Sequence, residues 1–326
     1  MTIEALLNLT DGVLQNRPSI QAIEGATVFP SKVDHGDLFI SSNQDEINTA
    51  VEKGAYTIIY DDEHISISDS DTAWIKVHSI EDAAFKLLRY VILEKEASFF
   101  YLNEHENSFL KMILLQKSNI AFIANEWRKA FEQILNSPQK IFVGTNRELM
   151  HRIKPDVKML NSDVEGYAVD DTLFKSTFKV NNYVYQDKEL APFHLNYLLS
   201  VVNFCKSNDL PYSIDRVKYT KHFVPVFIDG ALNTTHSSKS DKVVIFADNL
   251  QDINRAREYI KFNGTWVKSI VLTPPKTKVE NITRPHWFET EEEVREILKS
   301  VHFNYAFIYS LDKSILNQIK QEYSLF

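Results

Sequence analysis

The chain has 326 residues, 44% of them hydrophobic and 12% aromatic, which is enough for two or three domains with cores of their own. Its formal net charge is −8 with the acids spread along the chain, so we expect no nucleic-acid partner, because phosphate binding needs a cationic face. No apolar run is long enough to span a bilayer, and the N-terminus lacks the basic segment of a signal peptide. The single cysteine, Cys205, lies in an apolar helical stretch and is expected to be buried and unreactive, which together predicts a cytoplasmic protein without disulfides.

Residues 1–97 alternate between helical and extended patterns. The expected order is helix 3–14, extended segment 26–29, strand 37–40, helix 45–53, strand 56–60, strand 74–77 and helix 80–93. Gly54 follows the second helix directly, as a C′ glycine does. Alternation of this kind predicts an α/β sheet.

The stretch 98–116 predicts a short apolar strand at 99–102, a polar loop at 103–107 and an amphipathic helix from Ser108. Strand, loop and helix is the layout in which a glycine-rich loop binds phosphate at a helix N-terminus. Here the loop has no glycine and no lysine, and it carries Glu104 and Glu106 where an anion would bind. The chain has only eight glycines, and no two are closer than eleven positions, so every glycine-rich nucleotide-binding or nucleophile motif is missing.

Residues 222–326 alternate again. The expected elements are strands 226–228, 243–246, 270–272 and 306–309 and helices 250–262, 291–299 and 313–323. This order predicts a small Rossmann-like sheet.

Four passages carry a resemblance to a known family: SKVDHGDLFI at 31–40, NRELMHRIKPDVKML at 146–160, PFHLNYLLSVVNFCKSNDLP at 192–211 and IDGALNTTHSS at 228–238. They resemble the Mur ligases of peptidoglycan synthesis, and within that family the MurF type, which adds D-alanyl-D-alanine to a UDP-MurNAc-tripeptide. The resemblance implies a shortened α/β protein of three domains: 1–97 N-terminal, 98–221 central and 222–326 Rossmann-like. In the family, the segments aligned with 29–31 and 41–44 hold the uridine nucleotide.

The catalytic motifs of the family are not kept. Its phosphate loop, Gly-Thr-Asn-Gly-Lys-Thr, falls on Asn103, Glu104, His105, Glu106, Asn107 and Ser108, of which only the final hydroxyl persists. The family's magnesium-binding Glu and His are also not found. The resemblance therefore implies no catalytic residue, no bound metal and no nucleotide cofactor.

Three polar residues that match the family survive between the central and C-terminal parts: Asn196, Asp229 and Asn233. If their role is structural, Asp229 and Asn233 should bond backbone groups in the loop after the strand that ends at Ile228. If they bind a ligand, their side chains should face an open cleft.

The ten histidines show no HxxxH or HExxH spacing, which favours scattered histidines over a zinc site. The segment Glu104-His105-Glu106 is expected to be a solvated loop rather than a metal or acid–base cluster.

The favoured interpretation is a catalytically eroded Mur-ligase-like protein that acts by binding a peptidoglycan precursor, a Mur ligase or another cell-wall factor. One alternative is an ATP-dependent amide ligase of the Mur type with a rearranged nucleotide site. A second alternative is a new small-molecule site in an interdomain cleft.

Overall fold

The computed structural model describes residues 1–19, 22–116, 119–161, 166–280, 282 and 284–316. The chain forms two compact units. Unit 1 comprises Met1–Asn103 and Gln116–Leu160, and unit 2 comprises Glu104–Leu115 and Asn161–Phe326. Unit 2 thus takes a short segment from within the sequence of unit 1.

The first sheet of unit 1 is mainly parallel. Its strands are β1 (Val13–Leu14), β2 (Ala26–Thr27), β3 (Leu38–Ile40), β4 (Thr57–Tyr60) and β5 (Ala73–Lys76). They lie in the order β1-β5-β4-β3-β2, with β2 to β5 parallel and β1 antiparallel to β5. Every residue of β3 and β4 is buried, which explains their unbroken apolar sequences.

Two helices of this region begin and end for identifiable reasons. Helix α2 (Gln44–Glu52) begins after Asn43, whose side chain accepts from two backbone N–H groups, and Gly54 follows it with φ 90°, as expected for C′. Helix α1 (Ile3–Thr10) is shorter than the predicted 3–14, because Asp11 takes the left-handed conformation and its N–H bonds Leu7. The residues after it form β1 instead.

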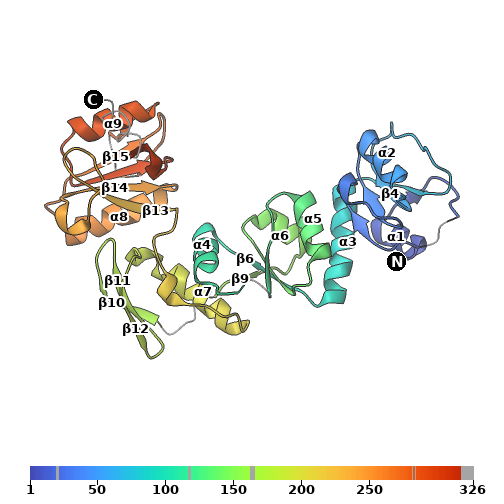
Figure 1. Ribbon diagram of the computed structural model, residues 1–326, viewed down its shortest axis with the longest axis horizontal. Helices are drawn as coiled ribbons and strands as arrows, with labels where there is room; N and C mark the ends of the chain where they lie inside the picture. Colours follow the sequence, from blue (N-terminus) through green and yellow to red (C-terminus); the bar gives the residue numbers. More distant parts are fainter. Residues whose placement is uncertain (20–21, 117–118, 162–165, 281, 283, 317–326) are drawn as a thin grey trace, which may run out of the picture. The chain divides into compact units, whose positions relative to one another are not determined.

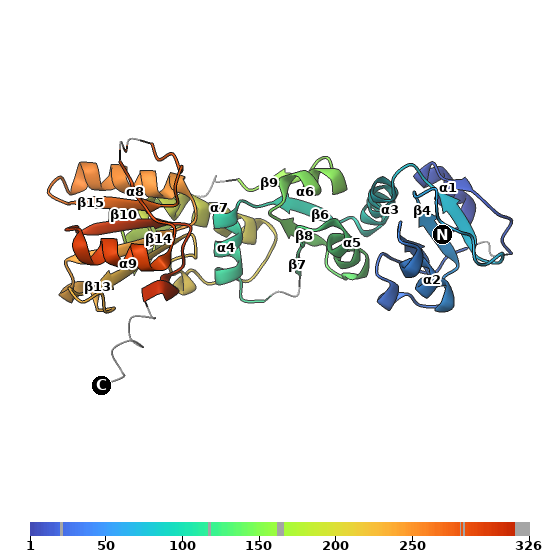
Figure 2. The same ribbon diagram turned by 90° about the horizontal axis from the view of Figure 1, so that it is seen from above.

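The second sheet of unit 1 is fully parallel, in the order β7-β8-β6-β9. Its strands are β6 (Ser98–Tyr101), β7 (Ile120–Phe122), β8 (Ile141–Gly144) and β9 (Lys158–Met159), and its helices are α5 (Trp127–Asn136) and α6 (Arg147–Ile153). Helix α3 (Ile80–Lys95) contacts α1 as well as α5 and α6, so it joins both sheets of unit 1 in one core (Figure 2).

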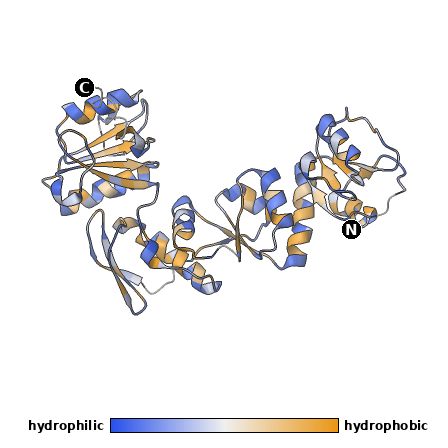
Figure 3. Cartoon of the chain, viewed as in Figure 1, coloured by the Kyte–Doolittle hydropathy of each residue, from blue (hydrophilic) through white to orange (hydrophobic). Residues whose placement is uncertain are grey.

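Unit 2 contains the C-terminal sheet, which has a helix on each face (Figure 1). The strands are β13 (Phe223–Ile228), β14 (Lys242–Ala247), β15 (Ser269–Thr273), β16 (His286–Trp287) and β17 (Tyr305–Tyr309), in the order β13-β14-β17-β15-β16. All are parallel except β13. Alternate residues of β14 pack with helix α8 (Leu250–Asn263) and with helix α9 (Glu291–Ser300), and the strands are the most apolar part of this layer (Figure 3).

The rest of unit 2 packs around two helices. Helix α4 (Glu104–Ile113) contacts helix α7 (Leu195–Ser207) and the 3₁₀ turn η3 (Ile214–Arg216). An antiparallel sheet of β10 (Gly166–Asp171), β11 (Ser176–Val180) and β12 (Tyr183–Lys188) precedes the 3₁₀ turn η2 (Pro192–His194). Cys205 of α7 is buried as expected, and burial raises the pKa of its thiol to about 12.

The predicted α/β class and the Rossmann-like C-terminal sheet are confirmed. Strand β3 of the N-terminal part and strand β14 of the C-terminal part lie in different sheets, so one continuous sheet does not span both parts. The domain boundaries near 97 and 221 remain a prediction. The predicted helix 313–323 is described only as far as the 3₁₀ turn η5 (Lys313–Leu316), and its remainder lies outside the described residues. Every helix in the described part of the chain is too short or too polar to cross a lipid bilayer.

Replacing Gly54 by alanine should lower the free energy of unfolding by about 1–2 kcal/mol, because an L-residue is strained at positive φ. The added Cβ would also lie 2.9 Å from Cδ2 of His35. The matched control is Gly230→Ala, since a Cβ there meets no atom within 4 Å. We expect the control to change stability by less than about 0.5 kcal/mol in urea unfolding. Equal losses in the two variants would contradict this account of Gly54.

Candidate functional site

The segment aligned with a phosphate loop is the first part of helix α4. The structure starts this helix at Glu104, so the predicted loop at 103–107 and helix start at Ser108 are wrong. The acidic residues of the first turn, Glu104 and Glu106, account for the earlier start, since carboxylates stabilise a helix N-terminus. Only Leu102 and Asn103 separate the end of β6 from this helix.

The prediction that His105 lies in a solvated loop is wrong. His105 belongs to a buried cluster in unit 2. Its Nε2 lies 3.1 Å from Oδ2 of Asp252 in the first turn of α8. Nε2 of His194, the last residue of η2, lies 3.0 Å from the same oxygen. We call these three residues the His–His–Asp cluster. Its ligand-type atoms all lie within 4.8 Å of one another.

Asp252 is held in place by the cap of its own helix. Asn249 is the N-cap of α8, and its Oδ1 accepts from the backbone N–H of Asp252 at 2.8 Å. Its Nδ2 donates back to Oδ2 of Asp252 at 3.0 Å. One carboxylate oxygen therefore has three nitrogen neighbours, whereas Oδ1 of Asp252 and Nδ1 of His105 are buried without a hydrogen-bond partner among the described residues.

Burial and hydrogen bonding set the protonation states in the cluster. The side chains of His194 and Asp252 are 3% and 1% exposed. Burial lowers the pKa of His194 and outweighs the opposing effect of Asp252. Burial alone would raise the pKa of Asp252, but hydrogen bonds from His105, His194 and Asn249 hold it far below its usual range. The favoured state is an ionised carboxylate beside a neutral His194.

Aromatic rings enclose His105. Its imidazole stacks on the ring of Tyr197, with centroids 4.8 Å apart and an interplanar angle of 12°. The rings of His194 and His222 lie 4.5 and 5.0 Å from it. The Tyr197 hydroxyl accepts from Nη1 of Arg255 at 3.1 Å. The prediction of scattered histidines is therefore wrong for these three, which converge from distant positions.

A second hydrogen-bonded chain adjoins the cluster. Nδ1 of His222 lies 2.6 Å from Oδ2 of Asp248, and Nε2 of His222 lies 2.8 Å from Oγ of Ser108. Because a carboxylate only accepts, Nδ1 carries the proton and Nε2 accepts from the serine. Hydroxyl, imidazole and carboxylate are linked through the same atoms in acyl-transfer triads. Ser108, however, lies inside α4, and the helix uses its backbone N–H. This N–H is therefore not available as an oxyanion donor, as it would be at the nucleophile of an acyl-transfer triad.

The predicted cleft residues do not join this cluster. Oδ1 of Asp229 accepts from the backbone N–H groups of Ala231 and Asn233, both at 2.9 Å, which is the backbone bonding expected for a structural role. The side chain of Asn233 donates to Asp229 rather than to the backbone. Asn196 is exposed on α7, and within the described residues no hydrogen bond links it to the other two. Whether any of the three contacts a ligand stays a prediction.

Most of the cluster could not be found from spacing. His194 and Asp252 are 58 positions apart, and Ser108 and His222 are 114 apart. The one local signal is the Asn249 cap with an acid three residues later, which predicts the start of α8 but not the histidines that meet it.

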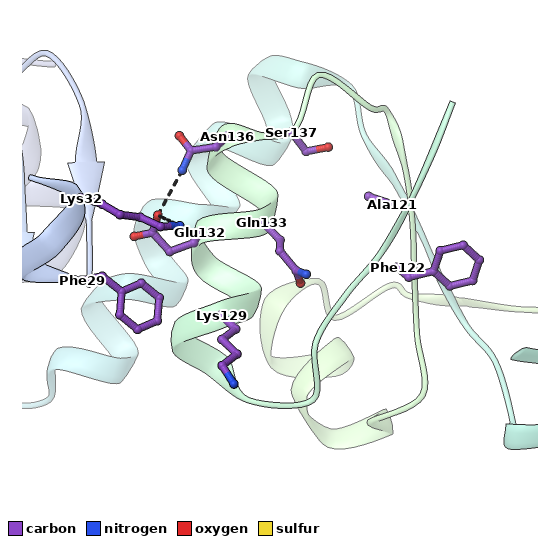
Figure 4. Close-up of a pocket in the computed structure, with 9 residues that line it drawn as sticks. All are labelled: Phe29, Lys32, Ala121, Phe122, Lys129, Glu132, Gln133, Asn136 and Ser137. Carbon is purple, nitrogen blue, oxygen red and sulfur yellow. Dashed lines mark hydrogen bonds and ion pairs between the residues drawn. The ribbon is translucent and has the colours of Figure 1, made fainter. Parts of the chain in front are cut away.

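Unit 1 contains a separate open pocket of about 520 Å³. Its walls come from the segment around η1 (Pro30–Lys32), from β7 and from α5, and are formed by Phe29, Lys32, Ala121, Phe122, Lys129, Glu132, Gln133, Asn136 and Ser137 (Figure 4). Glu132 is 3% exposed, accepts from Val28 N at 2.9 Å and forms an ion pair with Lys32 at 3.3 Å. This carboxylate therefore holds Val28 and Lys32 against α5.

No protein-family model matches the chain, and no curated protein matches its sequence. Solved structures do resemble it. The MurF ligase from Thermotoga maritima, solved in complex with ADP, aligns with a TM-score of 0.53 at 12% identity, over 91% of this chain and 96% of that chain. MurF from Acinetobacter baumannii aligns with a TM-score of 0.52 at 11% identity, over 98% of each chain. The chain therefore has the fold of a MurF-type Mur ligase, as the resemblance of its sequence predicted.

We expect Ser108 to be structural. Ser108→Ala should lower the free energy of unfolding by about 1 kcal/mol, because the buried His222 loses one of its two partners. A fluorophosphonate probe should not label the wild-type protein, since a nucleophile inside a helix lacks oxyanion donors.

The control is Ser200→Ala on α7, where the hydroxyl only bonds the carbonyl of Asn196 four residues earlier. That change should be neutral within about 0.5 kcal/mol. Probe labelling that disappears in Ser108→Ala would instead identify a reactive serine.

Proposed function

We propose that this protein is a catalytically eroded Mur-ligase-like protein that acts in the cytoplasm by binding a cell-wall precursor. Its fold is related to ATP-dependent ligases. The observation that carries the proposal is the start of α4 only two residues after β6, in the segment that aligns with the family's phosphate loop. In that segment His105 bonds the side chain of Asp252.

The start of α4 argues against nucleotide catalysis on physical grounds. A phosphate loop needs several residues between strand and helix whose backbone N–H groups point at the anion. Here only Leu102 and Asn103 lie between the end of β6 and the start of α4. The first turn carries Glu104 and Glu106. A triphosphate there would meet the exposed carboxylate of Glu104 and no loop lysine.

The pocket of unit 1 supports the binding half of the proposal. Its volume of about 520 Å³ lies within the range of small-molecule sites. Phe29 offers an aromatic wall, and Lys129 supplies positive charge suited to a pyrophosphate, while the charge of Lys32 is paired with Glu132. Phe29 stands in the segment 29–31 that aligns with the uridine-binding Asp-Ser-Arg of the Mur ligases, although Phe29-Pro30-Ser31 replaces those three residues.

The purified protein should not bind ATP tightly, with or without magnesium. Losing two charge-assisted hydrogen bonds of about 1.5–3 kcal/mol each weakens binding by roughly 10²–10⁴-fold. Isothermal titration calorimetry should therefore give a dissociation constant of about 1 mM or weaker. Magnesium-dependent binding in the low micromolar range would favour the alternative, an ATP-dependent amide ligase with a rearranged nucleotide site.

A UDP-MurNAc-tripeptide should bind the pocket of unit 1. Phe29→Ala should weaken that binding by about fivefold or more, because the variant loses an aromatic contact of about 1 kcal/mol or more. The control is Phe262→Ala, which removes a phenylalanine that is 81% exposed on α8. Fluorescence titration of both variants measures the difference. No binding by the wild-type protein, or equal binding by both variants, would contradict a precursor site in this pocket.

A further inference from the structure

We propose that the His–His–Asp cluster binds one zinc ion through Nε2 of His105, Nε2 of His194 and the carboxylate of Asp252. This inference rests on the cluster in unit 2 and goes beyond the proposed precursor site in unit 1, so either can fail without the other.

The spacing of the ligand atoms fits a single ion. Both imidazole nitrogens lie 3.0–3.1 Å from the same carboxylate oxygen. In a tetrahedral zinc site with bonds of about 2.0–2.1 Å, neighbouring ligand atoms lie about 3.3–3.4 Å apart. All three atoms lie within 4.8 Å of one another, so small side-chain movements would bring them to zinc distances.

The distribution of hydrogen bonds around Asp252 supports a cation. Oδ2 has nitrogen neighbours on His105, His194 and Asn249, whereas the buried Oδ1 has none among the described residues. Oδ1 stays without a hydrogen bond whether N–H donors or a cation face Oδ2, so the support for a cation comes from the two imidazole nitrogens that converge on Oδ2. Zinc bound at the two Nε2 atoms would take the place of these N–H donors beside Oδ2, with the proton of each neutral imidazole carried on Nδ1 instead. Nδ1 of His105 lacks a partner with or without the ion, so it does not distinguish the two states.

The donor set favours zinc over magnesium or calcium. Imidazole nitrogens suit zinc, whereas magnesium and calcium take oxygen ligands. Zinc binds ionised carboxylates and neutral imidazoles.

The surroundings supply the outer shell and leave one position open. The Asn249 amide orients Asp252, as second-sphere donors do in metal sites. His222 is engaged with Ser108 and Asp248 and is not available as a fourth ligand. Three protein ligands leave the fourth zinc position for water or a small ligand.

The test uses the full chain, treated with a chelator and then titrated with zinc against a chromophoric competitor. We expect one zinc per chain with an apparent dissociation constant below about 1 µM at pH 7. Cobalt(II) should replace zinc and give the intense visible absorption of a four-coordinate site. Magnesium and calcium should not compete.

Two variants locate the site, and one controls for adventitious chelation. Asp252→Asn and His105→Gln should each weaken zinc binding by at least about 100-fold. The control is His64→Gln, which removes a 94% exposed histidine 2.9 Å from Asp62, a surface pair with the same donor types. It should bind zinc like the wild type.

The zinc stoichiometry and the cobalt spectrum of the wild-type protein test the proposal even if a variant fails to fold. No stoichiometric zinc, or a six-coordinate cobalt spectrum, would overturn the proposal. So would zinc binding that is kept in folded Asp252→Asn, as judged by circular dichroism, or lost in His64→Gln.

Discussion

The carboxylate of Asp252 is the constraint on which unit 2 depends. It is almost fully buried, and a buried charge is tolerated only when it is paired and hydrogen-bonded. Its neighbours come from η2 and α4, and from the cap of its own helix. The positive end of α8 adds to this stabilisation, since Asp252 lies in the first turn. One buried charge therefore links three segments that are far apart in sequence.

The cores that build this fold lie outside the segment that aligns with the phosphate loop of the Mur ligases. Consecutive residues of β14 are apolar and face α8 and α9 in turn. In unit 1 the core that joins both sheets passes through α3. The first turn of α4 contributes no residue to these three cores. Function resides in sites carried by a fold, so the fold alone does not bring the activity of its relatives.

The fold was largely predictable where apolar patterning was strong. The run Thr57–Tyr60 is buried throughout and was expected as a strand, and Gly54 marks the end of α2 as predicted. Strands β10 and β12 escaped prediction because most of their residues are exposed and their apolar residues are consecutive, at 167–169 and 183–185, which gives no apolar alternation. The start of α4 was missed because a polar, acidic segment suits a loop and a first helical turn equally well. The cluster around Asp252 was out of reach, since its members meet only through tertiary packing.

The order of segments along the chain has a consequence for protein synthesis. Helix α4 is translated before α7, although its buried residues Phe109, Leu110 and Ile113 belong to the same unit as α7. About 80 residues separate the two helices, which at 5–20 residues per second corresponds to roughly 4–16 s. Unit 1 can complete its sheets during this interval, while the apolar face of α4 emerges from the ribosome without its main packing partner. The nascent chain thus presents a transient hydrophobic helix of the kind that chaperones recognise.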